Sequence, residues 1–283
     1  MPRPSYEDDH EEAGGRYVMR PSFAPLTRAV KLLLLVNLGV YLATFLLSFA
    51  SDAAYWSVVR LAGIDPALWR ESAPLLPLWQ LLSYGFLHSL DPWHVVLNML
   101  TLYCFGVMLE QELGPRRLLI TYFASQVVGG LCFLGLALAT HGSIPLIGAS
   151  GACFGVMVAV ATLWPSRPTV LYFIPLTLRT LALIFVGVEV FLFLLSLKAG
   201  ALDGVSHVTH LGGAIFGFVA ARTGLIRWDP VRSLAQQRAE RAVKSAADEE
   251  QRMDQLLEKI HREGMNALTR SEREFLKRVS SRR

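Results

Sequence analysis

Residues 148–165 read GASGACFGVMVAVATLWP, an apolar run that opens on glycine, alanine and serine. Its length predicts a membrane-embedded helix that begins near Ser150. At a helix start, unpaired backbone N–H groups and the positive end of the helix dipole favour a developing negative charge. The small neighbours Gly148 and Gly151 leave the Ser150 hydroxyl open to close approach. Ser150 is therefore a candidate nucleophile, with a capping serine beside a packing glycine as the alternative interpretation.

The composition is that of a membrane protein. The chain has 283 residues, of which 53% are hydrophobic, and its mean hydropathy is +0.39. A helix needs about 20 mostly apolar residues to cross the hydrocarbon core. The stretches that qualify are 31–50, 93–112, 117–139, 148–165, 180–197 and 207–224. The sequence thus predicts an all-α protein with a disordered head at 1–28, a membrane domain at 29–225 and a charged helical tail at 226–283.

A histidine in the sixth stretch provides a possible base for the serine. Ionisable groups inside spans are costly and usually functional, and His210 is such a group. Gly213 and Gly217 follow on roughly the same helical face, while Gly151 and Gly155 form a matching ridge on the serine's helix. Two small-residue ridges that face each other bring helix backbones together. We expect this contact to set imidazole and hydroxyl within hydrogen-bonding reach, as an activated nucleophile requires.

Two further histidines offer alternatives. His207 precedes His210 by three residues and is a rival base, although its place nearer the helix end favours solvent exposure. His88 lies six residues before His94, but no third ligand follows at a spacing typical of zinc sites. We therefore expect no metal and no cofactor.

A polar pair in the second stretch could serve the chemistry of acyl transfer. His94 and Asn98 are spaced i, i+4 and share one helical face. Both can donate hydrogen bonds, and acyl transfer needs donors aimed at the tetrahedral oxygen. The alternative is a pair that joins two helices.

The connection at 51–92 is long and apolar, but no part of it is long enough to span. Such a segment is typical of an interfacial or partly embedded loop. Lysine and arginine near the span ends indicate the orientation. One side carries Arg16, Arg20, Arg28, Lys31, Arg116, Arg117, Arg167, Arg179, Arg222 and Arg227, and the other only Arg60, Arg70 and Lys198. Both termini are expected to be cytoplasmic, with Ser150 near the outer face of a plasma membrane of bacterial type.

Six short motifs follow one another along the chain: Trp79-Gln80, Phe86-Leu87-His88, His94-x-x-x-Asn98, Gly106-x-x-x-Glu110, Gly148-Ala149-Ser150-Gly151 and His210-Leu211-Gly212-Gly213. Together they resemble the rhomboid family of intramembrane serine proteases, over about residues 29–225. The resemblance implies a six-helix bundle with a water-filled cavity that opens to the outside.

The resemblance also implies roles for individual residues. Ser150 would be the nucleophile and His210 the general base, in a dyad without a third acid. The oxyanion hole would consist of His94, Asn98 and the backbone N–H of Ser150. Phe154 matches a position whose aromatic ring packs on the catalytic histidine.

Three polar residues need a separate interpretation. Gln80 stands where the family commonly has an arginine, which leaves the packing of the first loop open. Glu189, in the middle of the fifth stretch, is expected to be protonated or hydrogen-bonded to a neighbouring helix, with gating or cation binding as alternatives. Glu110 is expected to join two helices.

The tail differs in composition from the rest of the chain. Apolar residues recur at helical spacing before Gly264, which fits a helix stop. Thr269 with Glu272 predicts a capping box that starts a second helix. The sequence therefore predicts a small helical hairpin.

The residues favour an active endopeptidase that cuts transmembrane proteins within the lipid bilayer. One alternative is a catalytically inactive relative that binds proteins in membrane-protein turnover, and another is a transporter, which would predict repeats or broken helices with midplane charges. The net charge of +4 comes largely from the cytoplasmic flanks, so it does not indicate nucleic acid as a partner.

Overall fold

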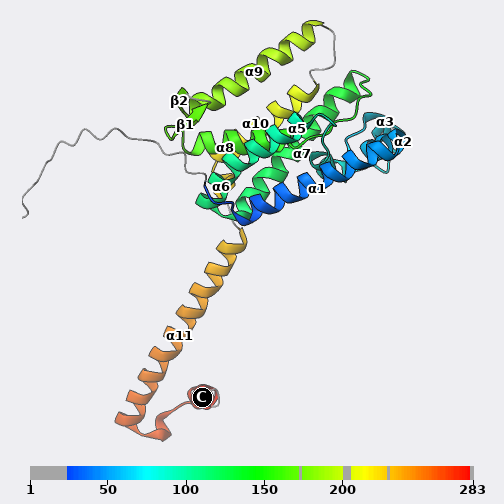
Figure 1. Ribbon diagram of the computed structural model, residues 1–283. Coiled ribbons are helices and arrows are strands. Elements are labelled where there is room, and N and C mark those ends of the chain that lie inside the picture. Colours follow the sequence, from blue (N-terminus) through cyan, green and yellow to red (C-terminus); the bar gives the residue numbers. More distant parts are fainter. Residues whose placement is uncertain (1–23, 172–173, 200–204, 228–229, 281–283) are drawn as a thin grey trace, which may run out of the picture. The chain divides into compact units, whose positions relative to one another are not determined.

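A computed structural model describes residues 24–171, 174–199, 205–227 and 230–280 (Figure 1). The chain divides into two compact units, Met1–Ile226 and Arg227–Arg283, and each is described by itself. Most of the segment that was predicted to be disordered, 1–28, lies outside the described residues.

Helices dominate the first unit, as the composition predicts. Those that correspond to the six apolar stretches are α1 (Arg28–Ala50), α5 and α6 (Pro92–Thr101 and Val107–Leu113), α7 (Pro115–Ala139), α8 (Ser150–Leu163), α9 (Leu178–Ala199) and α10 (Val205–Arg222). Among the described residues, four helical segments are long and apolar enough to cross a membrane: Arg28–Ala50, Pro92–Leu113, Pro115–Ala139 and Leu178–Lys198. At 14 residues α8 is shorter, and α10 is not among the four, so helix length alone does not establish six spans.

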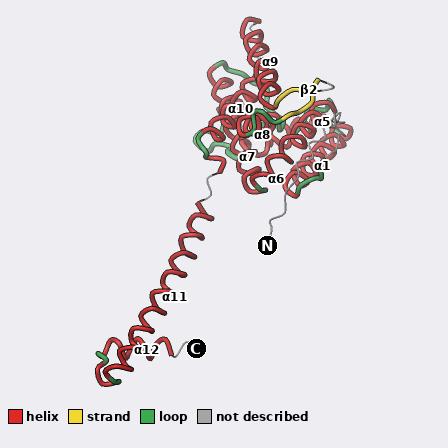
Figure 2. Tube along the Cα trace, turned by 90° about the vertical axis from the view of Figure 1, so that its left-hand side faces the viewer, coloured by secondary structure: helices red, strands yellow, loops and turns green. Residues whose placement is uncertain are grey.

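Two features depart from the prediction of uniform α-helices. The second predicted span is interrupted by a π-helical turn, η2 (Leu102–Gly106), between α5 and α6. Between α8 and α9 the chain forms an antiparallel pair of strands, β1 (Pro168–Leu171) and β2 (Ile174–Thr177), drawn in yellow in Figure 2. The sequence did not indicate these strands, in a connection where β-branched residues and prolines favour extended backbone over helix, and the fold remains predominantly helical.

The glycine ridges pack α10 against α8, as predicted. A Cβ atom added to Gly213 would overlap the carbonyl oxygen of Gly151, and one added to Gly217 would overlap that of Gly155. Only helices without side chains at these positions can approach so closely. Nearly every residue of α8 is buried, and α7 and α10 both pack on it (Figure 1). The serine's helix is thus the centre of the bundle.

The first loop is folded and anchored by Gln80. It contains α2 (Asp52–Ala62), α3 (Pro66–Glu71), α4 (Gln80–Ser83) and the 3-10 turn η1 (Tyr84–Phe86). The fully buried Gln80 side chain accepts hydrogen bonds from the Trp69 indole at 2.9 Å and the Asp65 backbone at 3.1 Å. Its amide nitrogen donates to the Arg60 carbonyl at 2.8 Å. A neutral amide therefore organises this loop through hydrogen bonds, without an arginine at that position.

Glu110 joins two helices, as predicted. Its carboxylate, on α6, accepts hydrogen bonds from the backbone N–H groups of Ala29 and Val30 at 3.0 and 2.9 Å. These are unpaired donors in the first turn of α1, so the acid caps one helix from another.

The second unit is a helical hairpin. It consists of α11 (Pro230–Glu263), a 3-10 turn η5 (Met265–Ala267) and α12 (Arg270–Ser280). A 3-10 turn, η4 (Leu225–Arg227), precedes α11 in the sequence. Gly264 ends α11 with a φ of 80°, in the left-handed region that favours glycine. The predicted capping box is present, since Glu272 accepts from the Thr269 backbone N–H at 2.7 Å. A small core of Leu256, Leu268 and Phe275 holds the hairpin together.

Candidate active site

Ser150 and His210 meet between the two central helices. The Oγ atom of Ser150 lies 2.6 Å from Nε2 of His210, which is a hydrogen-bonding distance. Ser150 is the first residue of α8, as predicted. His210 lies in the second turn of α10, which begins at Val205. The close packing of α8 and α10 at their glycines brings the two side chains together.

An aromatic ring fixes the plane of the imidazole. The ring of Phe154 stacks on His210 with a centroid distance of 4.7 Å and an interplanar angle of 4°. Phe154 lies one turn beyond Ser150 on α8, so a single helix supplies both the hydroxyl and the stacking surface. This stacking occurs at the position that the resemblance indicated, and an aromatic hydroxyl is not needed for it.

His94 presents an N–H group to the space in front of the serine. The backbone N–H of Ser89 lies 3.3 Å from Nδ1 of His94, and the Ser89 hydroxyl lies 3.0 Å from the same atom. A backbone N–H can only donate, so Nδ1 must accept, and the neutral ring then carries its proton on Nε2. A Cβ atom at Gly148 would lie 2.7 Å from that Nε2 and 3.7 Å from Ser150 Oγ.

Gly148 is required for this arrangement for two reasons. Its φ of 124° lies in the region that L side chains rarely adopt, and a side chain would fill the space between His94 and Ser150. The absence of a side chain at Gly148 therefore leaves open the space between His94 Nε2 and Ser150 Oγ.

Asn98 is close to the site but faces differently from the prediction. Its Nδ2 donates to the carbonyl of His94, 2.8 Å away on the same helix. Its own backbone carbonyl accepts from the Cys153 thiol at 3.4 Å. The role of Asn98 in an oxyanion hole stays a prediction. That role would use the second proton on Nδ2 of Asn98, which does not bond to the His94 carbonyl.

Glu189 joins the site from α9, which the sequence did not reveal. Its Oε2 lies 2.6 Å from Nδ1 of His207 and 2.9 Å from Nδ1 of His210. The prediction that His207 is solvent-exposed is wrong, since only 20% of its side chain is exposed. A hydrogen bond between Glu189 and a neighbouring helix is confirmed, because Oε2 of Glu189 lies within hydrogen-bonding distance of His207 Nδ1 on α10. A signal was present, because an acid within a span usually pairs with another ionisable group, and the next span offers two histidines.

The same three residues meet the first geometric requirement of a metal site. One ligand atom from each of Glu189, His207 and His210 can lie within 4.8 Å of the others. Imidazole and carboxylate are common zinc ligands. Direct contacts at 2.6 and 2.9 Å already connect the carboxylate to both rings, so the cluster is accounted for without an ion.

His88 is a buried neighbour of the site outside the spans. Its ring lies 5.1 Å from that of His94, edge to face, and the residue is 1% exposed. Burial and the charge of His94 together lower the pKa of His88 to about 4, although a backbone hydrogen bond with Phe86 opposes the shift. His88 is therefore neutral at physiological pH.

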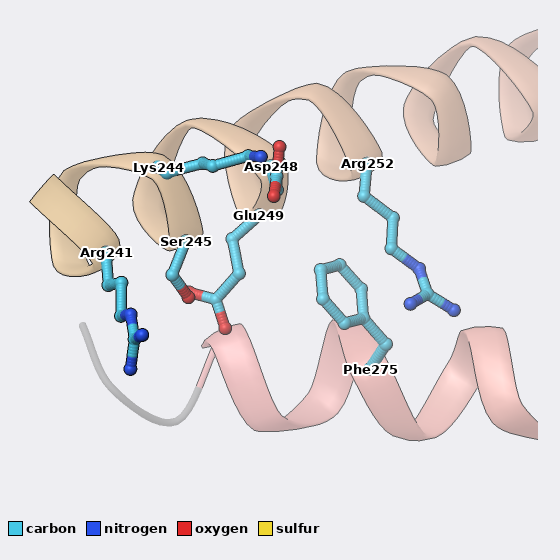
Figure 3. Close-up of a pocket in the computed structure, with 7 residues that line it drawn as sticks. All are labelled: Arg241, Lys244, Ser245, Asp248, Glu249, Arg252 and Phe275. Carbon is cyan, nitrogen blue, oxygen red and sulfur yellow. The ribbon is translucent and has the colours of Figure 1, made fainter.

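A shallow pocket on the second unit holds none of these residues. Figure 3 shows it between α11 and α12, with the guanidinium of Arg252 beside the Phe275 ring. The Cζ atom of Arg252 lies 4.8 Å from the ring centroid, which is a cation–π distance. The charged residues around it are of both signs, so the pocket has no marked preference for one kind of ligand.

Known proteins resemble the two units separately. Residues 76–227, more than half of the chain, match the rhomboid domain family. Residues 243–282 match a family of unknown function, DUF6576.

Three relatives from one plant show moderate similarity to this chain. RHOMBOID-like protein 4 of Arabidopsis thaliana is 32% identical over 53% of this chain and 34% of its own length. RHOMBOID-like protein 5 of the same plant is 33% identical, over 53% of this chain and 45% of its own length. Inactive RHOMBOID-like protein 8 of Arabidopsis thaliana is 26% identical, over 52% of this chain and 38% of its own length. The chain thus matches less than half the length of each of these relatives.

The apolar helices and these matches indicate a multi-pass membrane protein. The matched region contains the glycine ridges, the Ser150–His210 contact and the loop around His94. The chain belongs to the rhomboid family.

Proposed function

We propose that this protein is an intramembrane serine endopeptidase that uses Ser150 as nucleophile and His210 as general base. The observation that carries the proposal is the 2.6 Å distance between Ser150 Oγ and His210 Nε2. A serine hydroxyl is a poor nucleophile unless a base takes its proton. The imidazole is held by Phe154 and by α10, so it can accept that proton without first reorienting.

The proposed reaction has two stages. Ser150 Oγ attacks the scissile carbonyl carbon while its proton moves to His210 Nε2. The tetrahedral oxygen is stabilised by the Nε2–H of His94 and the backbone N–H of Ser150, with Asn98 as a further donor. The intermediate collapses as His210 gives its proton to the leaving amine, which leaves an acyl group on Ser150. Water, deprotonated by His210, then hydrolyses this ester and restores the free enzyme.

The substrate class we propose is transmembrane protein segments that reach the site from the lipid bilayer. A helix hides its carbonyls in internal hydrogen bonds, so it must unwind locally before Ser150 can attack. Glycine or proline lowers that cost. With both termini cytoplasmic, Ser150 lies near the outer face, and the cut is expected at the outer end of the substrate.

A second candidate is an inactive relative that binds membrane proteins without cutting them. The observation in its favour is the similarity to a protein named as inactive, at 26% identity. Against it stand the serine and histidine of this chain, which are both present and in contact.

Labelling with a fluorophosphonate separates the two candidates. This probe reacts with an activated serine and needs no knowledge of the substrate. The wild-type protein should be labelled at Ser150, and Ser150→Ala and His210→Ala should not. Thermal unfolding shows that the variants are folded. A folded wild type that remains unlabelled would favour the binding protein.

Mass spectrometry of cleaved substrate then locates the cut, and a cut at the cytoplasmic end would contradict the proposed orientation.

A further inference from the structure

The general base has a carboxylate on its far side. Nε2 of His210 faces Ser150 at 2.6 Å, and Nδ1 of the same ring lies 2.9 Å from Oε2 of Glu189. Only 12% of the Glu189 side chain and 16% of the His210 side chain are exposed. Hydroxyl, imidazole and carboxylate therefore follow one another in the order found in serine hydrolases with three-residue sites.

The protons of the imidazole require an acceptor at that position. A neutral imidazole carries one proton, and His210 can accept the serine proton only if its own proton is on Nδ1. Nδ1 of His210 is buried and has no well-aligned hydrogen bond within the described residues. The 2.9 Å distance between His210 Nδ1 and Glu189 Oε2 is that of an ion pair. Catalytic hydrogen bonds are often long or poorly aligned in the resting protein and tighten only when substrate binds.

The carboxylate also suits the charge that the reaction creates. When the serine proton reaches His210, the ring becomes a cation in a low-dielectric environment. A carboxylate at Nδ1 stabilises this cation through a contact that already exists in the resting protein. His207, whose Nδ1 lies 2.6 Å from the same oxygen, holds Glu189 from the other side.

We propose that Glu189 is a positioning residue for the general base, which makes the site a Ser150–His210–Glu189 triad. The inference rests on the proposed hydrolase function. Glu189 does not touch the substrate; it keeps the His210 proton on Nδ1 and compensates the imidazolium charge. Because Glu189 belongs to α9, the base is complete only while α9 lies against α10.

A different role would give the opposite result. Many apolar side chains of α9 point outward, such as Leu183, Phe191 and Leu194, which are 66%, 64% and 58% exposed. In that role Glu189 would only hold α9 against α10 through its contacts with the two histidines and so hinder substrate entry. Its removal would in that case accelerate cleavage, whereas removal of a positioning residue slows the chemical step.

The test compares Glu189→Gln with a matched control in the full-length protein. Glutamine keeps the size of the side chain and removes its charge. Glu110→Gln removes a buried carboxylate elsewhere in the bundle, which caps α1 and has no part in the site. Each protein is assayed for cleavage of a helical transmembrane peptide in liposomes, for its rate of fluorophosphonate labelling and for thermal unfolding.

We expect Glu189→Gln to lower kcat by about 10–100-fold with KM within about twofold, because the lost interaction forms with the transition state. Labelling should slow by a similar factor. Glu110→Gln should lower the unfolding temperature and leave kcat unchanged. A kcat of Glu189→Gln within twofold of wild type, or above it, would overturn the proposal.

A second measurement uses only the wild-type protein, so it does not depend on whether a variant folds. In wild-type protein with ¹⁵N-labelled histidine, the proposal predicts a downfield-shifted, slowly exchanging proton on His210 Nδ1. An Nδ1 without a proton would overturn it even if Glu189→Gln cannot be purified. Failure of the hydrolase proposal is a separate result, since wild type would then neither cleave nor react with the fluorophosphonate.

Discussion

Gly213 on α10 lies so close to Gly151 on α8 that a Cβ atom on Gly213 would overlap the Gly151 carbonyl oxygen. This contact fixes the separation of the two helices that carry the serine and the histidine. The oxygen belongs to the backbone, so it cannot move aside as a flexible side chain could. The geometry of the site therefore depends on a glycine that has no chemical role.

Gly213→Ala should lower the free energy of unfolding by about 1–3 kcal/mol, the usual cost of overpacking. It should also reduce cleavage by the folded fraction, because the helices must separate and lengthen the Ser150–His210 contact. Thermal unfolding and specific activity measure the two effects. Gly135→Ala is the matched control, since nothing lies within 4 Å of a Cβ atom there. Equal effects of the two substitutions would contradict the close packing.

His94→Ala should lower kcat by about 10²–10³-fold with little change in KM. The reason is that the Nε2–H of His94 faces the space where the oxyanion forms, and Ser89 holds its tautomer. Steady-state cleavage kinetics measure both constants. His141→Ala, at an exposed histidine away from these contacts, is the control and should behave as wild type. A larger change in KM than in kcat would indicate substrate binding instead.

His88 should make the fold sensitive to acid. Its pKa is lowered from 6.5 to about 4 in the folded state, so below pH 6.5 the unfolded chain binds a proton that the folded chain resists. Stability is therefore lost as pH falls from 6.5 to about 4, by about 3 kcal/mol in all at 1.4 kcal/mol per unit. Unfolding of wild type and His88→Gln across this range measures the difference. Parallel curves for the two proteins would exclude His88 as the cause.

The capping box of the tail should depend on the charge of Glu272. The Thr269 backbone N–H, the Lys259 ammonium and the Thr269 hydroxyl lower the pKa of Glu272 to about 2. Its stabilising effect is thus complete above pH 4.5 and lost as pH falls through about 2. At pH 7, Glu272→Gln should make the amide protons of α12 exchange with solvent several-fold faster. Glu274→Gln, which loses an exposed ion pair with Arg270, should change exchange little.

The chain's local patterns predicted part of this structure well. The start of α8 at Ser150, the facing glycine ridges and the capping box at Thr269 follow from short-range spacing. The stacking of Phe154 was implied by the resemblance to the rhomboid family. Helical periodicity determines which residues share a face. The spacing of the glycines on α8 and on α10 therefore predicts that these two faces pack against each other.

Features that depend on contacts between distant segments were not predictable in the same way. The Glu189 carboxylate reaches His210 only because α9 packs beside α10, and no spacing within either helix encodes that placement. The His94 tautomer depends on a backbone N–H group of a loop. The π-helical turn η2 lies inside a continuous apolar stretch, where no local residue pattern marks it.

The central claim is that the contact between Ser150 and His210 hydrolyses peptide bonds within a membrane. Its most direct test is incubation of the purified protein with a helical transmembrane substrate in liposomes, with wild type beside Ser150→Ala. We expect wild type to release two defined fragments and the folded Ser150→Ala protein to release none. Cleavage by Ser150→Ala at a rate close to that of wild type would contradict the account.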